Sequence, residues 1–295
     1  MNERCVGLLG ATSLLGACLQ QRLIQDGWQI TAFSQHQVIQ NHANITWKQL
    51  RTNPQTEFNT EQKKITSWLC VAPIWTLAEH FNLLLAQGAQ RIIVLSSTSR
   101  FTKDTSTDKG EQAIAHRLAE SEETLQKWAM NNGIEWVILR PTLIYGRGGD
   151  KNITEIARFI GRFGFFPLLG PANGLRQPIH VEDVAAACLA ALVMSSCAAN
   201  RAYNLTGGET LDYHAMIIRV FIALNRSPRL FTVPRWFFQL TIIALRWLPR
   251  YRHWTTAMAE RMNQDLVFDC SDAKQDLNFS PRPFKLTEED LPTNI

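Results

Sequence analysis

The sequence has 295 residues, of which 45% are hydrophobic and 19% are charged, and its formal net charge is +4. This composition supports a sizeable core and excludes wholesale disorder. Its lysines and arginines are scattered, apart from a run at 246–252, so the charge does not indicate a nucleic-acid surface. The length suits one large α/β unit with an appended lobe, or two modest domains.

The six cysteines form no CxxC pair and no Cys/His cluster. Several lie in apolar runs, so we interpret them as reduced thiols in the core of a cytoplasmic protein. The chain enters a strand directly at its N-terminus, and no signal peptide is expected. No residues have the spacing of a metal site, and no metal is expected.

Residues 5–33 are predicted to form a strand, a tight turn, a helix and a second strand. Cys5–Leu9 is a short apolar run of the buried-strand type. The helix that follows ends at Gly27, and its apolar residues on one face are Leu15, Leu19, Leu23 and Ile24. A dinucleotide-binding domain begins with such a strand–helix–strand unit.

The turn between the first strand and the helix, GATSLLG at 10–16, carries the phosphate-binding prediction. Gly10 lets the chain turn sharply, and the helix N-terminus then points free N–H groups at a diphosphate. Gly16 lets the helix lie close to the strands, and Ser13, in place of a middle glycine, offers a hydroxyl to phosphate. The alternative is an ordinary tight turn. The candidate cofactor-binding residues here are Gly10, Thr12, Ser13, Leu14, Leu15 and Gly16.

The choice of cofactor is expected to depend on the residues after the second strand. An NAD site usually places Asp or Glu there, but this chain has Ser34, Gln35 and His36. Ser34 and Gln35 are therefore candidate cofactor contacts, and NADP is preferred over NAD, although no arginine is present for a 2′-phosphate. The next apolar strand, 68–72, ends at Ala72 and Pro73, which are also expected to line the cofactor.

The rest of the chain alternates between helix and strand patterns. Residues 100–112 are polar and are expected to be a mobile surface loop. His180 and Asp183 are expected to form a capping and inter-lobe arrangement, in which Asp183 caps the helix that starts at Val184. Helices are predicted at 76–87, 113–132, 153–163, 184–194 and 213–224, and strands at 45–47, 91–95, 136–139, 177–181 and 202–206.

The segment 234–249 is apolar but is interrupted by Gln239, Thr241 and Arg246. It is too short and too polar to cross a bilayer. Two alternatives remain open: a helix packed within the C-terminal lobe, or an amphipathic helix through which residues 234–252 contact a membrane surface.

Several segments, in order, resemble the extended branch of the short-chain dehydrogenase/reductase superfamily, the NAD-dependent epimerases and dehydratases. The resemblance covers nearly the full chain. It lies in GATSLLG at 10–16, VLSSTS at 94–99, LRPTLIYGRG at 139–148, PIHVEDVAAA at 178–187, YNLTGG at 203–208 and DLVFDCSDAKQDLNFSPRPF at 265–284.

The resemblance implies an α/β fold, a Rossmann-type doubly wound parallel sheet with a smaller C-terminal lobe. The NAD(P)-binding domain is expected at 1–145, with 178–206 returning to it, and 146–295 is expected to form mainly the substrate-side lobe. The implied substrate is a nucleotide sugar or a similar carbonyl compound. A homodimer is also considered.

The family's usual catalytic pair, a tyrosine four residues before a lysine, is absent from the helix after the fifth strand. Ser97 matches the family's serine, which would polarise a carbonyl. The candidates for acid–base work are His116, whose pKa range suits it, and Tyr145 in the IYGRG loop. For His116 the alternative is a solvent-facing position, and for Tyr145 it is a packing role.

The remaining candidates also follow from the resemblance. Arg140 and Pro141 are expected beside the nicotinamide, with a structural turn as the alternative. Ser96 is a further candidate cofactor contact and, like Thr98, a near match for the position of Ser97. Arg147 and Arg176 are expected to bind the diphosphate of a substrate, with solvated arginine as the alternative. Two functions stay open: an NAD(P)-dependent oxidoreductase, epimerase or dehydratase, or a non-catalytic dinucleotide-binding scaffold or sensor subunit.

Overall fold

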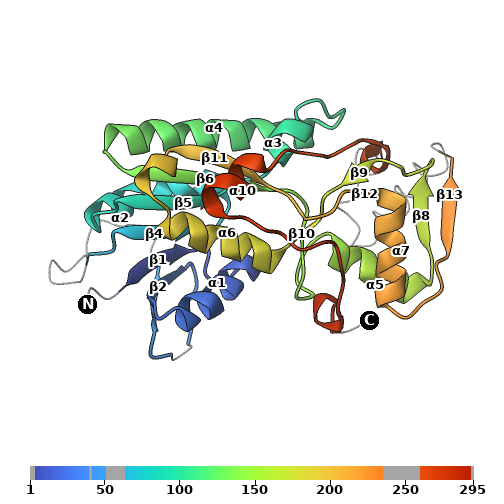
Figure 1. Cartoon of the computed structure of the whole chain (residues 1–295), viewed down its shortest axis with the longest axis horizontal. Coiled ribbons are helices and arrows are strands. Elements are labelled where there is room, and N and C mark those ends of the chain that lie inside the picture. Colours follow the sequence, from blue (N-terminus) through green and yellow to red (C-terminus); the bar gives the residue numbers. More distant parts are fainter. Residues whose placement is uncertain (1–3, 40–41, 51–63, 235–259, 294–295) are drawn as a thin grey trace.

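The computed structural model describes residues 4–39, 42–50, 64–234 and 260–293. Its centre is a seven-stranded sheet of order β11-β6-β5-β4-β1-β2-β3, in which every neighbouring pair is parallel (Figure 1). The strand order runs outward from β1 and β4, so the sheet is doubly wound and the predicted fold class is confirmed. The strands are β1 (Cys5–Leu9), β2 (Gln29–Ser34), β3 (Ile45–Gln49), β4 (Ser67–Cys70), β5 (Arg91–Leu95), β6 (Glu135–Pro141) and β11 (Arg201–Leu205).

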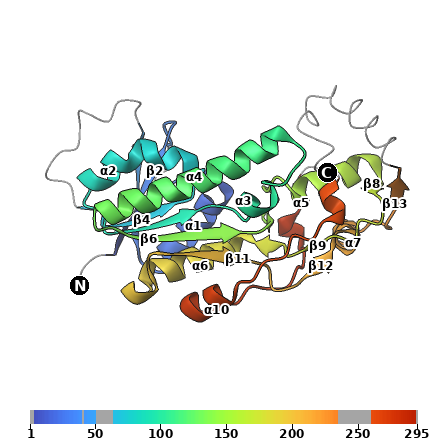
Figure 2. The same cartoon turned by 90° about the horizontal axis from the view of Figure 1, so that it is seen from above.

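Helices cover both faces of this sheet (Figures 1 and 2). Successive strand residues point to opposite faces, so Leu8 packs into one core and Leu9 into the other. The first core is closed by α1 (Leu14–Gln25) and α6 (Val181–Val193). The second is closed by η1 (Ile74–His80), α2 (Phe81–Ala86) and α4 (Lys109–Asn131).

A smaller lobe with its own apolar core lies beyond the carboxyl ends of the strands. Phe159, Ile217 and Phe221 are among its buried residues. Its elements are α5 (Ile153–Phe163), α7 (Tyr213–Ala223), the parallel pair β8 (Phe166–Leu169) and β13 (Leu230–Val233), the antiparallel pair β9 (Leu175–Arg176) and β12 (Leu211–Asp212), and η4 (Arg261–Asn263).

The chain passes between the two lobes more than once. After α5 it returns through β10 (Ile179–His180), which pairs with β7 (Ile144–Tyr145), and through α6, η2 (Ser196–Ala198) and β11. Near the C-terminus, α10 (Ser271–Leu277) packs on α6 and β11, and η5 (Glu288–Asp290) follows it. The sheet core therefore includes residues from late in the chain, Ala273, Leu277 and Phe279.

Two segments, the stretch 100–112 and the start of α6, differ from their prediction. The polar stretch 100–112 is not one loop, because α3 (Ser99–Thr102) lies at its start and α4 already begins at Lys109, with Asp108 as its N-cap. Helix α6 begins at Val181 with His180 as its cap, so the prediction of Asp183 as the cap is wrong. Asp183 instead accepts hydrogen bonds from the backbone and side chain of Arg282.

Candidate functional site

The turn between β1 and α1 is tight because two glycines leave no room for side chains. Gly10 has φ +84°, and a Cβ there would lie 2.4 Å from the backbone nitrogen of Ala72. A Cβ on Gly16 would lie 2.3 Å from the carbonyl oxygen of Gly10. Gly16 therefore lets the helix approach the turn itself.

Ser13 stabilises this turn from within. Its Oγ donates to the Gly10 carbonyl at 2.8 Å and accepts the Gly16 N–H at 3.0 Å. The hydroxyl thus acts as the N-cap of α1, a role that was not expected from the sequence.

The first turn of α1 offers donors that fit a diphosphate. Within the described part of the chain, the N–H groups of Leu14 and Leu15 have no hydrogen-bond acceptor. Both groups belong to the positive end of a 12-residue helix. Ala72 and Pro73 follow β4 beside the turn, and Val71 donates its N–H to the Leu9 carbonyl. The turn at Gly10–Gly16, which leaves no room for a Cβ at either glycine, and the free N–H groups of Leu14 and Leu15 form a cradle that fits the diphosphate of a dinucleotide.

The end of β2 carries the residues expected to choose the cofactor. Ser34 is buried and its Oγ accepts the His36 N–H at 3.2 Å. The carbonyl of the exposed Gln35 accepts a hydrogen bond from the Gln49 side chain. No carboxylate follows this strand within 34–39.

A buried carboxylate that was not expected from the sequence organises the turn around Ser97. Glu122 of α4 has a side chain only 1% exposed. It accepts a hydrogen bond from Ser96 Oγ at 2.5 Å, two from Arg140 Nε at 3.0 and 3.2 Å, and one from Arg140 Nη2 at 2.6 Å. Arg100 is a further ion-pair partner.

These contacts bracket Ser97, because Ser96 and Arg100 lie on either side of it. Thr98 donates its N–H and hydroxyl to the Pro141 carbonyl, each at 3.2 Å. Ser97 Oγ itself accepts the Ser99 N–H at 3.1 Å. The structure therefore brings Ser96, Arg140 and Pro141 together around Ser97, at the carboxyl ends of β5 and β6.

The main contact of His116 is with Asp104 and not with the turn around Ser97. Its ring is 69% exposed, and its Nε2 lies 3.7 Å from a carboxylate oxygen of Asp104. It lines a shallow groove on the outside of α4 that also includes Arg100 and Glu122. The exposed position agrees with the solvent-facing alternative more than with an acid–base role.

Tyr145 lies in the core of the C-terminal lobe. It is fully buried, with edge contacts to His180 and Phe284. Its hydroxyl donates to the Lys285 carbonyl at 3.4 Å, and burial raises its pKa to about 12. A phenol with this pKa and this placement does not favour the acid–base role predicted for it.

A buried His180–Asp290 pair fastens the loop after β7. His180 Nδ1 accepts the Glu182 N–H, so Nε2 carries the proton and donates to Asp290 Oδ1 at 3.0 Å. Asp290 also accepts from the backbone of Arg147 and from the N–H and hydroxyl of Thr287. Burial raises the pKa of Asp290, but these hydrogen bonds outweigh it and lower the pKa to about 2.

Replacing Asp290 with asparagine is expected to lower the free energy of unfolding by about 2 kcal/mol at pH 7, because four donors lose their carboxylate. A depressed pKa in the folded state gives stability that is present above the unfolded pKa and is lost as the pH falls. The difference between the wild type and Asp290→Asn should therefore shrink between pH 4 and pH 2. Urea unfolding across this range measures it. The exposed neighbour Glu289, changed to glutamine, is the control, and a difference that stays constant with pH would contradict the assignment.

The two arginines expected at the substrate are both engaged by protein groups. Arg147 donates to Gln21 at 2.6 Å and to Glu182 at 3.0 Å, which ties the loop to α1 and α6. Arg176 is buried and donates to the carbonyls of Leu175, Gln264 and Arg261. Burial and the nearby Arg261 lower the pKa of Arg176 to about 10.

Arg176 thus holds in place a second arginine, which was not among the residues expected from the sequence. Arg261 belongs to η4 of the small lobe, and its guanidinium reaches across to Glu111 of α4. Lys103, which precedes α4, lies near the same charged groups. Burial and Arg261 lower its pKa, whereas Glu111 and Asp108 act in the opposite direction. Three cationic side chains therefore lie close to the carboxylates of Glu111 and Asp108 where the two lobes meet.

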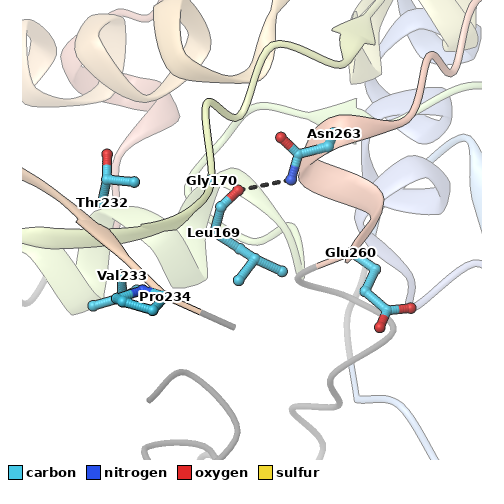
Figure 3. Close-up of a pocket in the computed structure, with 7 residues that line it drawn as sticks. All are labelled: Leu169, Gly170, Thr232, Val233, Pro234, Glu260 and Asn263. Carbon is cyan, nitrogen blue, oxygen red and sulfur yellow. Dashed lines mark hydrogen bonds between the residues drawn. The ribbon is translucent and has the colours of Figure 1, made fainter. Parts of the chain in front are cut away.

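A hollow of about 600 Å³ lies in the small lobe next to η4. Figure 3 shows its lining, with Asn263 donating to the Leu169 carbonyl at 2.7 Å. None of the site residues predicted from sequence lines it.

The predicted membrane contact at 234–252 falls, beyond Pro234, outside the described residues. No described helix is long and apolar enough to cross a membrane, and the described residues contain no His/Cys/Asp/Glu cluster suited to a metal.

Comparison with known proteins finds a family match for part of the chain, which includes Ser97, Glu122 and Arg140 but not the glycine turn. Residues 75–206 match the model of the NAD dependent epimerase/dehydratase family. The chain is 27% identical over 118 residues to NADH dehydrogenase (ubiquinone) 1 alpha subcomplex subunit 9, mitochondrial, of Arabidopsis thaliana. This match covers 40% of this chain and 29% of that protein. It is 24% identical over 122 residues to UDP-glucose 4-epimerase of Vibrio cholerae, which covers 41% and 37%. These matches thus span well under half the length of either relative.

The fold comparison covers almost the whole chain. The structure of UDP-glucuronic acid 4-epimerase from Bacillus cereus in complex with NAD superposes with a TM-score of 0.69 at 14% identity, over 97% of this chain and 95% of that one. At this identity the likeness concerns the fold alone. It supports the doubly wound fold, and the family match over residues 75–206 agrees with the resemblance to NAD-dependent epimerases and dehydratases that the sequence segments indicated.

Proposed function

Because residues 75–206 match the NAD dependent epimerase/dehydratase family, we propose that the protein binds a nicotinamide dinucleotide at the N-terminus of α1 and uses it on a nucleotide sugar or a similar carbonyl compound. The observation that carries the proposal is the cradle at Gly10. Its positive φ, the absence of space for a Cβ and the free N–H groups of Leu14 and Leu15 all suit a diphosphate. In this proposal residues 1–145 and 178–206 form the dinucleotide side, and most of 146–295 forms the substrate side.

The proposed cofactor is NADP, with NAD as the alternative. No carboxylate follows β2 to accept hydrogen bonds from both ribose hydroxyls, which disfavours NAD. Ser34, Gln35 and His36 offer neutral groups to a 2′-phosphate instead. The Bacillus cereus neighbour was solved with NAD, so the two dinucleotides have to be compared directly.

The proposed substrate carries a diphosphate, as a nucleotide sugar does. Support comes from the cations between the lobes, where Arg261 is held by Arg176 and lies near Lys103. A guanidinium pairs with two phosphate oxygens at once, so Arg261 suits this contact. Arg176, whose donors hold main-chain carbonyls, would act by positioning Arg261.

The proposed chemistry departs from the family's usual acid–base pair. A bound nicotinamide would supply hydride exchange with the substrate carbon. Ser97 would donate a hydrogen bond to the substrate oxygen, since its turn is fixed by Glu122, Arg140 and Arg100. Helix α4 contains no tyrosine, so another group has to move the proton.

The test is a titration of the purified protein with NADPH and NADH, followed by the fluorescence of its nine tryptophans. We expect micromolar binding of NADPH and weaker binding of NADH. Tighter NADH binding would reverse the choice of cofactor, and binding of neither would refute the proposed site. With a substrate found by screening UDP-sugars, Ser97→Ala should keep cofactor affinity and lose turnover. Full turnover by that variant would exclude the role of Ser97.

A non-catalytic dinucleotide-binding subunit is the second candidate. It is favoured by the absence of tyrosine from α4 and by the burial of Tyr145. The Arabidopsis relative is itself named as a subunit of a larger enzyme. Cofactor binding without turnover of any UDP-sugar would support this candidate, and turnover of one would exclude it.

A further inference from the structure

Glu111 is a helix residue whose carboxylate crosses from one lobe to the other. It is the third residue of α4, and its N–H is accepted by the N-cap residue Asp108 at 3.0 Å. A glutamate at this position usually reaches back to the N–H of the cap. Here Ser106 Oγ accepts that N–H, at 3.2 Å, and the Glu111 side chain instead pairs with Arg261.

Both partners of this pair are held in place by other contacts. Ser106 Oγ donates to the second oxygen of Glu111 at 2.8 Å. On the other side, Arg176 binds the Arg261 carbonyl, and Asn263 binds the Leu169 carbonyl, so η4 is fixed to the small lobe. The side chains of Arg261 and Glu111 are only 18% and 9% exposed. Figure 2 shows the N-terminal end of α4 pointing toward this lobe.

Charged groups of both signs surround the pair, the cations Lys103 and Arg176 and the carboxylates of Asp108 and Asp265. Lys103 and Arg176 both have their pKa values lowered by burial and by Arg261. The group that pairs with the Arg261 guanidinium here is the protein's own carboxylate, that of Glu111. An anionic ligand that reaches Arg261 has to take its place.

We propose that Glu111 is an internal competitor for the substrate, whose carboxylate occupies Arg261 until a phosphate of a nucleoside diphosphate displaces it. The inference rests on the proposed function, because it takes the nucleotide-sugar diphosphate as the ligand. Glu111 then determines specificity. A diphosphate carries enough charge to replace a carboxylate that Ser106 also holds, whereas a neutral ligand gains nothing from the exchange.

The experiment measures the affinity of UDP by calorimetry for the wild type, Glu111→Gln, Arg261→Gln and the double variant. Glu111→Gln is expected to bind UDP about tenfold more tightly, because the guanidinium no longer has a competing carboxylate. Arg261→Gln should bind more weakly, and adding Glu111→Gln to it should bring no gain. Uridine, which has no phosphate, should bind all four proteins alike. Glu120→Gln removes the same charge from an exposed position on α4 and should leave the UDP affinity unchanged.

Each outcome is decisive. Equal or weaker UDP binding by Glu111→Gln would overturn the inference while leaving the substrate class standing, since the carboxylate would then only orient Arg261. Absence of UDP binding in every variant would refute the proposed substrate together with the inference. If Glu111→Gln does not fold, Ser106→Ala frees one carboxylate oxygen and should tighten UDP binding about threefold. No change in that folded variant would count against the proposal.

Discussion

Replacing Gly10 with alanine is expected to abolish dinucleotide binding and to lower the free energy of unfolding by about 3 kcal/mol. The backbone at Gly10 has φ +84°, which strains any residue with a Cβ. That Cβ would also lie 2.4 Å from the nitrogen of Ala72 and 2.8 Å from the carbonyl carbon of Val71. These are backbone atoms at the end of β4, and they cannot swing aside as a flexible side chain would.

Gly27 provides the matched control, because it has φ +75° but a Cβ added there would meet no atom within 4 Å. Gly27→Ala should therefore show only the cost of the backbone conformation, about 1 kcal/mol, with unchanged cofactor affinity. Urea unfolding and NADPH titration of both variants separate the two effects. Equal behaviour of the two variants would show that contact with β4 is unimportant.

Replacing Glu122 with glutamine is the second change expected to have a large effect, a loss of about 3 to 5 kcal/mol of folding stability. The amide keeps the shape of the side chain but leaves the guanidinium groups of Arg100 and Arg140 without their carboxylate. It also weakens the hydrogen bond from Ser96 that fixes the end of β5.

The matched control for Glu122→Gln is the same substitution at the neighbouring Glu123, which is exposed on the same helix. Its side chain is 63% exposed and pairs with Lys127 one helical turn away. Glu123→Gln should leave the free energy of unfolding almost unchanged, because an exposed ion pair stabilises the fold very little. Chemical denaturation of the two variants measures the difference. Similar small losses for both would mean that solvent or a rearranged side chain compensates the two arginines.

The sheet and the glycine turn could be predicted because their determinants are local. Short apolar runs predict buried strands, and a glycine directly after β1 predicts the turn wherever the rest of the chain goes. Helix α5 has the bounds that the sequence predicts, since its apolar stripe is regular and Gly164 ends it. The segment 76–87 is less regular: it starts as the 3₁₀ helix η1 and becomes α-helical only at Phe81.

The parts of the candidate site that could not be predicted depend on contacts far apart in the sequence. In the sequence Glu122 is one of several glutamates on a polar helix. No residue close to it in the sequence indicates that it will be buried against Arg140 of the next strand. Glu111 and Arg261 are 150 residues apart. The capping prediction for Asp183 failed for a similar reason, because its partner Arg282 comes 99 residues later.

The late return of the chain to the sheet also has a consequence for its synthesis. When residue 145 has left the ribosome, β6 is an open edge, because its neighbour β11 has not yet been made. The face later covered by α6 exposes apolar residues of α1 and β4 until residue 193 follows. The loop after β7 can form its hydrogen bond from the Arg147 N–H to Asp290 only when Asp290 has left the ribosome. The nascent chain therefore has an unpaired strand edge and uncovered apolar surface through much of translation, which is the condition under which chaperones bind.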